Sequence, residues 1–184
     1  MKIKSLTLGT LGAATLFASA PVWAEEYRCT GSVGSVYLDN IFVPDGASCT
    51  LNRTRAKGNI VVGNGATLKA TSVSINGNLQ AEGAHSVVVV GSSTFGGSVQ
   101  IVQGNSASID RARINGDILF DENTGPVSAT SNTVGGNLQA FKNYAGVSVR
   151  NNRIKGNLQC KENIPAPTGG GNQASSKEDQ CARL

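Results

Sequence analysis

The chain offers few of the residues on which nucleophilic catalysis depends. It has 184 residues and one histidine, His85, which lies in a predicted turn beside Ser86. Acyl transfer needs a nucleophile, a base and a group that orients the base, and one histidine in a turn does not complete such a triad. The sequence also contains no CxxC pair. We therefore expect no metal site and no cofactor.

The carboxylates do not form an obvious catalytic pair either. A glycoside hydrolase needs two carboxyl groups facing each other across about 5–10 Å. Asp110, Asp117, Asp121 and Glu122 are close in sequence, but the repeat described below distributes them over different faces. No unit of that repeat carries an insertion that would wall a groove. We therefore expect a protein that is not an enzyme, with a polysaccharide lyase or glycoside hydrolase as the alternative.

A pentapeptide of the type Gly-Asn-Leu-Gln-Cys, seen at residues 156–160, returns throughout the chain. Earlier copies begin at Gly58, Gly77, Gly97, Gly116 and Gly136, so that successive copies are 19 or 20 residues apart. A fixed period of this length is typical of a solenoid, in which each unit buries its apolar face by stacking on its neighbours. The repeat therefore determines the fold class before any single residue is considered.

Apolar residues recur at fixed places within each unit, in three clusters with a spacing of two. Around Gly77 the clusters include Leu68 with Ala70, Ile75, and Leu79 with Ala81. Spacing of two is strand periodicity, with one face inward. Three short strands in 19–20 residues describe one coil of a right-handed parallel β-helix. We predict an all-β solenoid of about seven coils over residues 39–184, preceded by an irregular N-terminal cap at residues 25–38.

Residues 1–24 have the composition of a secretory signal peptide. Lys2 and Lys4 precede an uncharged, mostly apolar run that ends in small residues at Ala24. The run is too short and too rich in small residues for a membrane span, and no later segment is apolar enough to be one. Cleavage after Ala24 leaves 14 Lys and Arg against 12 Asp and Glu. We expect a secreted or periplasmic chain, and a net charge of +2 does not indicate a nucleic-acid partner.

The four cysteines fit two disulfides at the ends of the solenoid. An even number of cysteines in an exported chain suggests paired bridges, for which three pairings exist. Cys29 lies 20 residues before Cys49, and Cys160 lies 21 before Cys181. Each pair would occupy nearly the same column on adjacent coils, within the Cα separation that a disulfide needs. We predict Cys29–Cys49 and Cys160–Cys181, which would limit fraying of the terminal coils.

Two columns of asparagines recur at the coil spacing and are interpreted as structural. The columns consist of Asn132, Asn152 and Asn172, and of Asn123, Asn143 and Asn163. Asparagines stacked in this way can bond amide to amide, and asparagine tolerates the left-handed backbone that tight corners need. A binding role for these columns is the alternative.

Two outward surfaces are candidate binding faces. The first, rich in amides, takes its members from the fourth and second pentapeptide positions: Gln80, Gln100, Gln139, Gln159, Asn78, Asn137 and Asn157. The second is a basic stripe of Arg55, Arg113 and Arg153, interleaved with Ser74, Thr94 and Thr133, with Arg53, Arg111 and Arg150 beside it. Arginine recognises carboxylate, sulfate and phosphate, so the stripe suits an acidic glycan. Solvated polar surface is the alternative for both faces, and the irregular threonine positions argue against ice binding.

Several motifs of the chain are distinctive: residues 45–51 read DGASCTL, Gly-Asn-Leu-Gln recurs, and residues 156–163, 165–172 and 177–181 read GNLQCKEN, PAPTGGGN and KEDQC. On these motifs, nearly all of the mature chain resembles a family of short exported bacterial β-helix repeat proteins. The resemblance is specific at the C-terminal end. It implies the β-helix fold, export and disulfides, and it transfers no catalytic residues. We therefore interpret the chain as a secreted structural or binding protein of the cell surface, periplasm or extracellular matrix, with polysaccharide as the expected partner.

Overall fold

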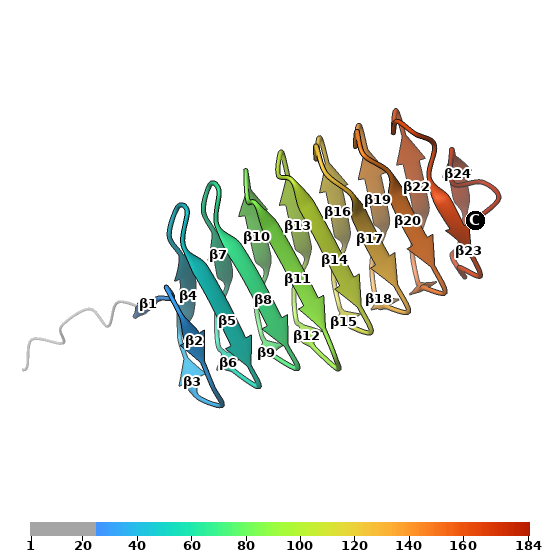
Figure 1. Ribbon diagram of the computed structural model, residues 1–184. Coiled ribbons are helices and arrows are strands. Elements are labelled where there is room, and N and C mark those ends of the chain that lie inside the picture. The colour runs from blue at the N-terminus through green and yellow to red at the C-terminus, as the bar shows by residue number, and fades with distance from the viewer. Residues whose placement is uncertain (1–24) are drawn as a thin grey trace, which may run out of the picture.

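The computed structural model describes residues 25–184, which form an all-β parallel solenoid of about eight turns with three strands per turn (Figure 1). The chain visits three sheets in turn, so neighbouring strands within a sheet come from successive coils. The predicted fold class is therefore confirmed. Among these residues no helix is present that is long and apolar enough to cross a membrane.

The three sheets run the length of the stack. Sheet A contains β1 (Glu26–Arg28), β4 (Asn40–Val43), β7 (Ile60–Val62), β10 (Leu79–Glu82), β13 (Val99–Val102), β16 (Ile118–Asp121), β19 (Leu138–Phe141), β22 (Leu158–Lys161) and β24 (Lys177–Asp179). Sheet B contains β2 (Ser32–Val33), β5 (Ser48–Asn52), β8 (Thr67–Thr71), β11 (Ser86–Val90), β14 (Ser106–Asp110), β17 (Val127–Thr130), β20 (Val147–Arg150) and β23 (Thr168–Gly170). Sheet C contains β3 (Tyr37–Leu38), β6 (Arg55–Ala56), β9 (Ser74–Ile75), β12 (Thr94–Phe95), β15 (Arg113–Ile114), β18 (Thr133–Val134) and β21 (Arg153–Ile154).

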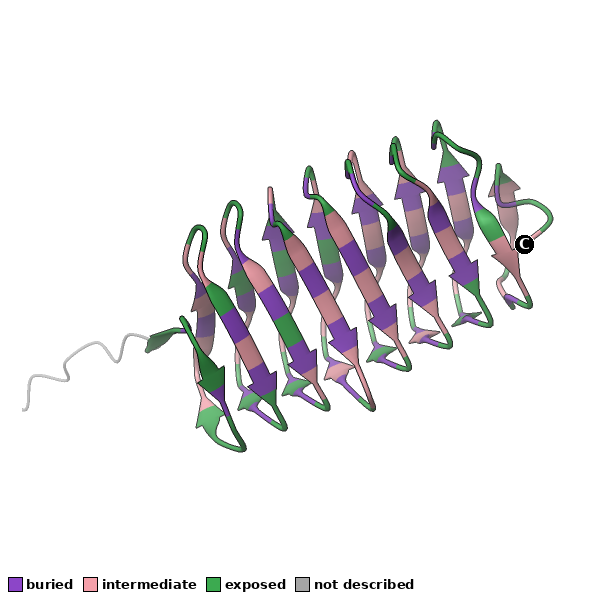
Figure 2. Ribbon diagram, viewed as in Figure 1, coloured by how far each residue is buried: buried purple, intermediate pink, exposed green. Residues whose placement is uncertain are grey.

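The core consists of columns of aliphatic side chains that face inward from all three sheets. Leu79, for example, pairs in register with Ile60 on one side and Val99 on the other, and all three are fully buried. Buried and exposed residues alternate along the strands (Figure 2). This alternation is the period of two that predicted the strands, and the register stacks like residues on like residues.

Residues 25–38, predicted to be an irregular cap, are more regular than expected. They contain β1, β2 and β3, which pair with β4, β5 and β6 and so add a first coil to all three sheets. The pentapeptide is absent from this segment, and its strands have only two or three residues. These residues form strands because they hydrogen-bond to the edge of the next coil, although their own sequence pattern does not predict strands.

The repeat glycine has a packing role that sequence periodicity does not reveal. None of the six repeat glycines adopts a left-handed backbone. A methyl group at Gly97 would overlap Oδ1 of Asn78 in the preceding coil. That oxygen accepts a hydrogen bond of 2.8 Å from the N–H of Ser98. The glycine of one coil therefore leaves room for the asparagine oxygen of the preceding coil, and the N–H of the residue after that glycine binds this oxygen.

Both predicted disulfides are present at the ends of the stack. Cys29 bonds to Cys49 with a Cα separation of 5.5 Å, and Cys160 bonds to Cys181 with 5.2 Å. Each bridge joins a terminal coil to its neighbour. Two disulfides in one chain indicate an oxidising location, either extracellular or periplasmic. The signal peptide predicted at residues 1–24 lies outside the described residues.

The two asparagine columns form buried ladders, as predicted. Asn132 Nδ2 donates to Asn152 Oδ1 at 3.0 Å, and Asn143 Nδ2 donates to Asn163 Oδ1 at 2.8 Å. The left-handed backbone expected of these asparagines falls instead on the preceding residue of each corner, for instance Ser131 with a φ of 57°. The asparagines thus line the inside of the corners and satisfy backbone groups there.

Candidate binding faces

The glutamines of the predicted amide-rich face point outward from sheet A, but they differ along the stack. Gln80 and Gln100 are neighbours and are exposed. Gln139 donates to Gln159 at 2.8 Å, and Gln159 donates to the carboxylate of Glu178 at 2.6 Å. Leu119 separates the two groups in the column. The amide groups of the second half are therefore already bound to one another.

The asparagines predicted for the same face are largely engaged in holding the coils together. Oδ1 of Asn78 accepts from the Ser98 N–H at 2.8 Å, and Oδ1 of Asn137 accepts from the Asn157 N–H at 2.9 Å. All three predicted asparagines are only partly exposed. The adjacent coil therefore uses the amide oxygens of Asn78 and Asn137, and a binding role for Asn78, Asn137 and Asn157 stays a prediction.

The predicted basic stripe is a true column on the outer face of sheet C. The register runs Arg55, Ser74, Thr94, Arg113, Thr133 and Arg153, and all three arginines are exposed. Arg55 and Arg113 are three coils apart, and Arg113 and Arg153 are two coils apart, with about 4.8 Å between adjacent coils. The three belong to one surface of the solenoid, although Arg150, expected beside them, projects from sheet B instead.

These three arginines carry charge without a carboxylate partner in residues 25–184. Other basic residues near them are paired: Lys57 lies 3.0 Å from Asp39, and Arg111 lies 3.0 Å from Asp110. No ion pair of the described chain involves Arg55, Arg113 or Arg153. An unpaired, exposed guanidinium retains all of its donors for an external anion.

A hollow of about 290 Å³ lies on this face beside Arg113. Its polar lining consists of Ser74, Asn76, Thr94, Arg113 and Asn115, arranged around Gly96, with Ile75 and Phe95 also contributing. Sequence reasoning placed Ser74 and Thr94 in the stripe but missed Asn76, Gly96 and Asn115. Each missed residue lies two positions after a member of the stripe: Asn76 after Ser74, Gly96 after Thr94 and Asn115 after Arg113, where the next outward position of a strand is expected.

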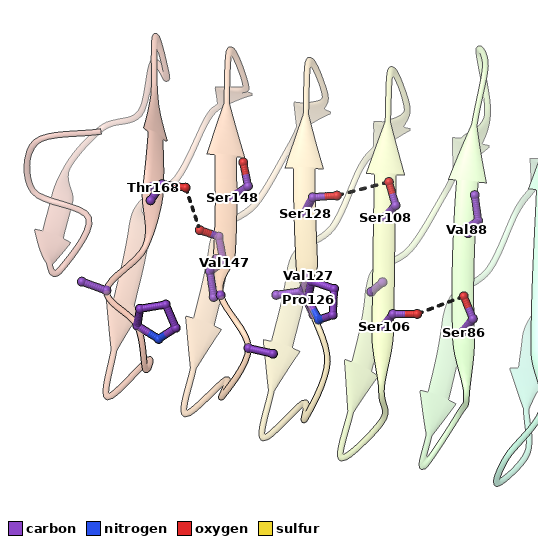
Figure 3. Close-up of a pocket in the computed structure, with 15 residues that line it drawn as sticks. Ser86, Val88, Ser106, Ser108, Pro126, Val127, Ser128, Val147, Ser148 and Thr168 are labelled. Carbon is purple, nitrogen blue, oxygen red and sulfur yellow. Dashed lines mark hydrogen bonds between the residues drawn. The ribbon is translucent and has the colours of Figure 1, made fainter.

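Sheet B carries a larger, shallow trough of about 450 Å³ that crosses five coils (Figure 3). Its floor is a row of small side chains, and two of its hydroxyl pairs bond internally: Ser106 to Ser86 at 3.1 Å and Ser128 to Ser108 at 3.2 Å. Pro126 and Pro165 also line it, and no charged residue does. The serine column was also missed, although Ser108, Ser128 and Ser148 are spaced by 20 residues in the sequence.

The carboxylates considered for catalysis are mostly engaged in structural contacts. Asp110 is paired with Arg111, and Oδ1 of Asp117 accepts from the Asn137 N–H at 2.6 Å. Partial burial raises the pKa of Asp121, and the charge of Glu122 adds to this increase. Hydrogen bonds from Gln103 and Lys142 lower the pKa of Glu122 itself.

The described residues contain no group of three or more His, Cys, Asp and Glu side chains arranged to hold a metal ion. Comparison of the chain with protein-family models, with curated proteins and with solved structures finds no match. The surface geometry of the solenoid is therefore the basis for assigning a function.

Proposed function

We propose that the protein is a secreted binding protein that holds an acidic polysaccharide along the outer face of sheet C. The observation that carries the proposal is the column of three exposed arginines without a carboxylate partner in residues 25–184. Arginine forks bind carboxylate and sulfate groups in a bidentate manner. Serine, threonine and asparagine side chains between the arginines would bind sugar hydroxyls.

The shape of the face supports a linear polymer as the ligand. Outward positions on sheet C repeat with the coil spacing of about 4.8 Å over seven strands, so the face is long and narrow. Its strands contain only two residues each. A linear chain can lie along a face of this shape, whereas a folded partner needs about 800 Å² of surface on each side for a stable interface.

Binding assays on the purified protein with soluble polyuronate test this proposal. Replacing Arg113→Ala together with Arg153→Ala should weaken binding by about tenfold or more, because two charge-assisted contacts are removed. A matched control, Lys69→Ala with Lys161→Ala, removes the same charge from sheets B and A and should change affinity by less than about twofold. Binding to polyuronate should also weaken as salt is added, since the arginines are exposed.

Two results would contradict the proposal. One is an equal loss of affinity in the arginine variant and in the control, which would point to net charge rather than to sheet C. The other is failure of the protein to bind any acidic glycan. Release of shortened products from polyuronate by the unmodified protein would instead support the alternative, a polysaccharide lyase or glycoside hydrolase.

A further inference from the structure

The hollow beside Arg113 contains a set of hydrogen-bonding groups that the protein itself does not use. Arg113, Thr94 and Ser74 project from three successive strands of sheet C, and Asn115 and Asn76 follow two residues later on the outer two of these coils. None of these five side chains has a hydrogen-bond or ion-pair partner within residues 25–184. They offer a guanidinium fork, two amides and two hydroxyls to solvent.

Polar columns elsewhere on the solenoid are more often bonded internally. On sheet A, Gln139 donates to Gln159, which donates to Glu178. On sheet B, Ser106 donates to Ser86, and Ser128 donates to Ser108. Stacked identical side chains can satisfy one another, but the mixed column of Arg113, Thr94 and Ser74 does not. The donors of this mixed column therefore remain free, as do those of the stacked pair Gln80 and Gln100 on sheet A.

Gly96 forms the centre of the hollow. It lies between Asn76 and Asn115 in the stack. The N–H of Gly96 donates to the carbonyl oxygen of Ile75 at 2.8 Å, and the N–H of Asn115 donates to the carbonyl oxygen of Phe95 at 3.0 Å. A methyl group at Gly96 would overlap the carbonyl oxygen of Asn76. The backbones of the two coils therefore approach closely at this position, where only glycine fits.

The dimensions of the hollow match one sugar residue. Asn76 and Asn115 are two coils apart, about 9.6 Å, and outward positions two residues apart along a strand are separated by about 6.6 Å. The volume of about 290 Å³ is close to the lower limit of small-molecule sites. A folded protein domain does not enter such a space, whereas one ring of a chain lying along the face does.

We propose that this hollow is a subsite for a single uronic acid residue, whose carboxylate binds Arg113 and whose hydroxyls bind Asn76, Asn115 and Thr94. The inference rests on the proposed function, because it assigns a preferred sugar to the face that would hold an acidic polysaccharide. It also goes further: the protein would recognise the sugar, and not only the negative charge. A polyanion without sugar hydroxyls would use the arginine and leave the amides unbound.

Titration with two probes of equal charge tests the subsite. The probes are a uronic acid oligosaccharide and an inorganic polyphosphate with the same number of negative charges, both at moderate salt. We expect the unmodified protein to bind the oligosaccharide at least tenfold more tightly. Thr94→Val keeps the shape but removes a hydroxyl, and it should weaken oligosaccharide binding severalfold while leaving polyphosphate binding unchanged.

Asn115→Asp provides a second variant, because it replaces an amide donor in the hollow with a carboxylate of the same size. It should lower oligosaccharide affinity by about tenfold or more through repulsion of the ligand carboxylate. Asn64→Asp is the matched control, since Asn64 is exposed at a corner of the stack away from sheet C and the net charge changes equally. It should change the affinity by less than twofold. Circular dichroism checks that all variants are folded.

The outcomes separate the subsite from the proposed function. Equal binding of both probes, or equal effects of Thr94→Val on both, would overturn the subsite while leaving sheet C as a general polyanion face. Equal effects of Asn115→Asp and Asn64→Asp would also overturn it. Failure of the unmodified protein to bind either probe would contradict the proposed function and the subsite together.

Discussion

At the scale of single residues, the buried asparagines show how polar side chains stabilise a core built from parallel coils. Asn143 uses its whole amide: Oδ1 accepts from Asn123 Nδ2 at 2.9 Å, and Nδ2 donates to Phe120 O at 3.1 Å and to Asn163 Oδ1 at 2.8 Å. Asn143 is fully buried. If the amide of Asn143 were removed, these groups of Asn123, Phe120 and Asn163 would each lose a hydrogen bond inside a buried corner.

Asn143→Ala should therefore destabilise the protein by about 3 kcal/mol or more, since an unsatisfied buried polar group costs about 1–3 kcal/mol and several are created. Urea unfolding monitored by circular dichroism measures the change. The control Asn64→Ala, at an exposed corner, should change the free energy of unfolding by less than about 0.5 kcal/mol. A loss below about 1 kcal/mol for Asn143→Ala would show that water or rearrangement replaces the ladder.

At the scale of elements, each coil depends on the edge offered by its neighbour. Strand β24 pairs with β22, and within residues 25–184 no strand pairs with its other edge. Its Glu178 accepts hydrogen bonds from Ser176 and from Gln159, which together lower the pKa of the Glu178 carboxyl below its ordinary value of 4.5. The terminal coil is therefore partly held by an ionised group.

Acidification should loosen this coil first. Because the folded-state pKa of Glu178 is lowered, its contribution to stability is complete above pH 4.5 and is lost as the pH falls through the folded-state value. We expect amide exchange protection in β24, corrected for intrinsic rates, to fall below pH 4.5 before protection in β13 does. Glu178→Gln should remove most of this difference. A uniform decrease in protection along the stack, or an unchanged difference in the variant, would contradict the role of Glu178.

At the scale of the whole molecule, stability is distributed along a stack in which each coil contacts only its neighbours. In such an array the ends are the weakest places, because a terminal coil has one neighbour instead of two. Both disulfides join a terminal coil to the coil next to it. They act where a solenoid frays and where exposed strand edges would pair with other chains.

Removal of either disulfide should therefore have a local effect. Each bridge closes a loop of about twenty residues, which corresponds to roughly 3 kcal/mol in the chain-entropy model. We expect Cys160→Ala with Cys181→Ala to lose exchange protection in β22 and β24 while β10 and β13 keep theirs. The pair Cys29→Ala and Cys49→Ala should do the same for β1 and β4. Loss of protection throughout the stack in either variant would show that the solenoid unfolds as one unit.

Much of this architecture follows from the sequence by itself. The 19–20-residue period, the three apolar clusters and the cysteine spacing predict the parallel β-helix and both disulfides, because residues one period apart occupy the same column on adjacent coils. The same argument predicts the asparagine ladders and the column of Arg55, Arg113 and Arg153. These are all consequences of a repeat whose geometry is nearly constant.

Only the tertiary structure decided which polar residues remain free. Asn78 is partly exposed and Asn115 is exposed, yet the oxygen of Asn78 is taken by the next coil whereas the amide of Asn115 has no partner within residues 25–184. The strands of residues 25–38 likewise depend on the paired edge of the following coil. A repeat specifies the column in which a side chain lies, but its hydrogen-bond partners depend on contacts between coils. Those contacts distinguish the amides that join the coils from the groups on sheet C that have no partner within residues 25–184.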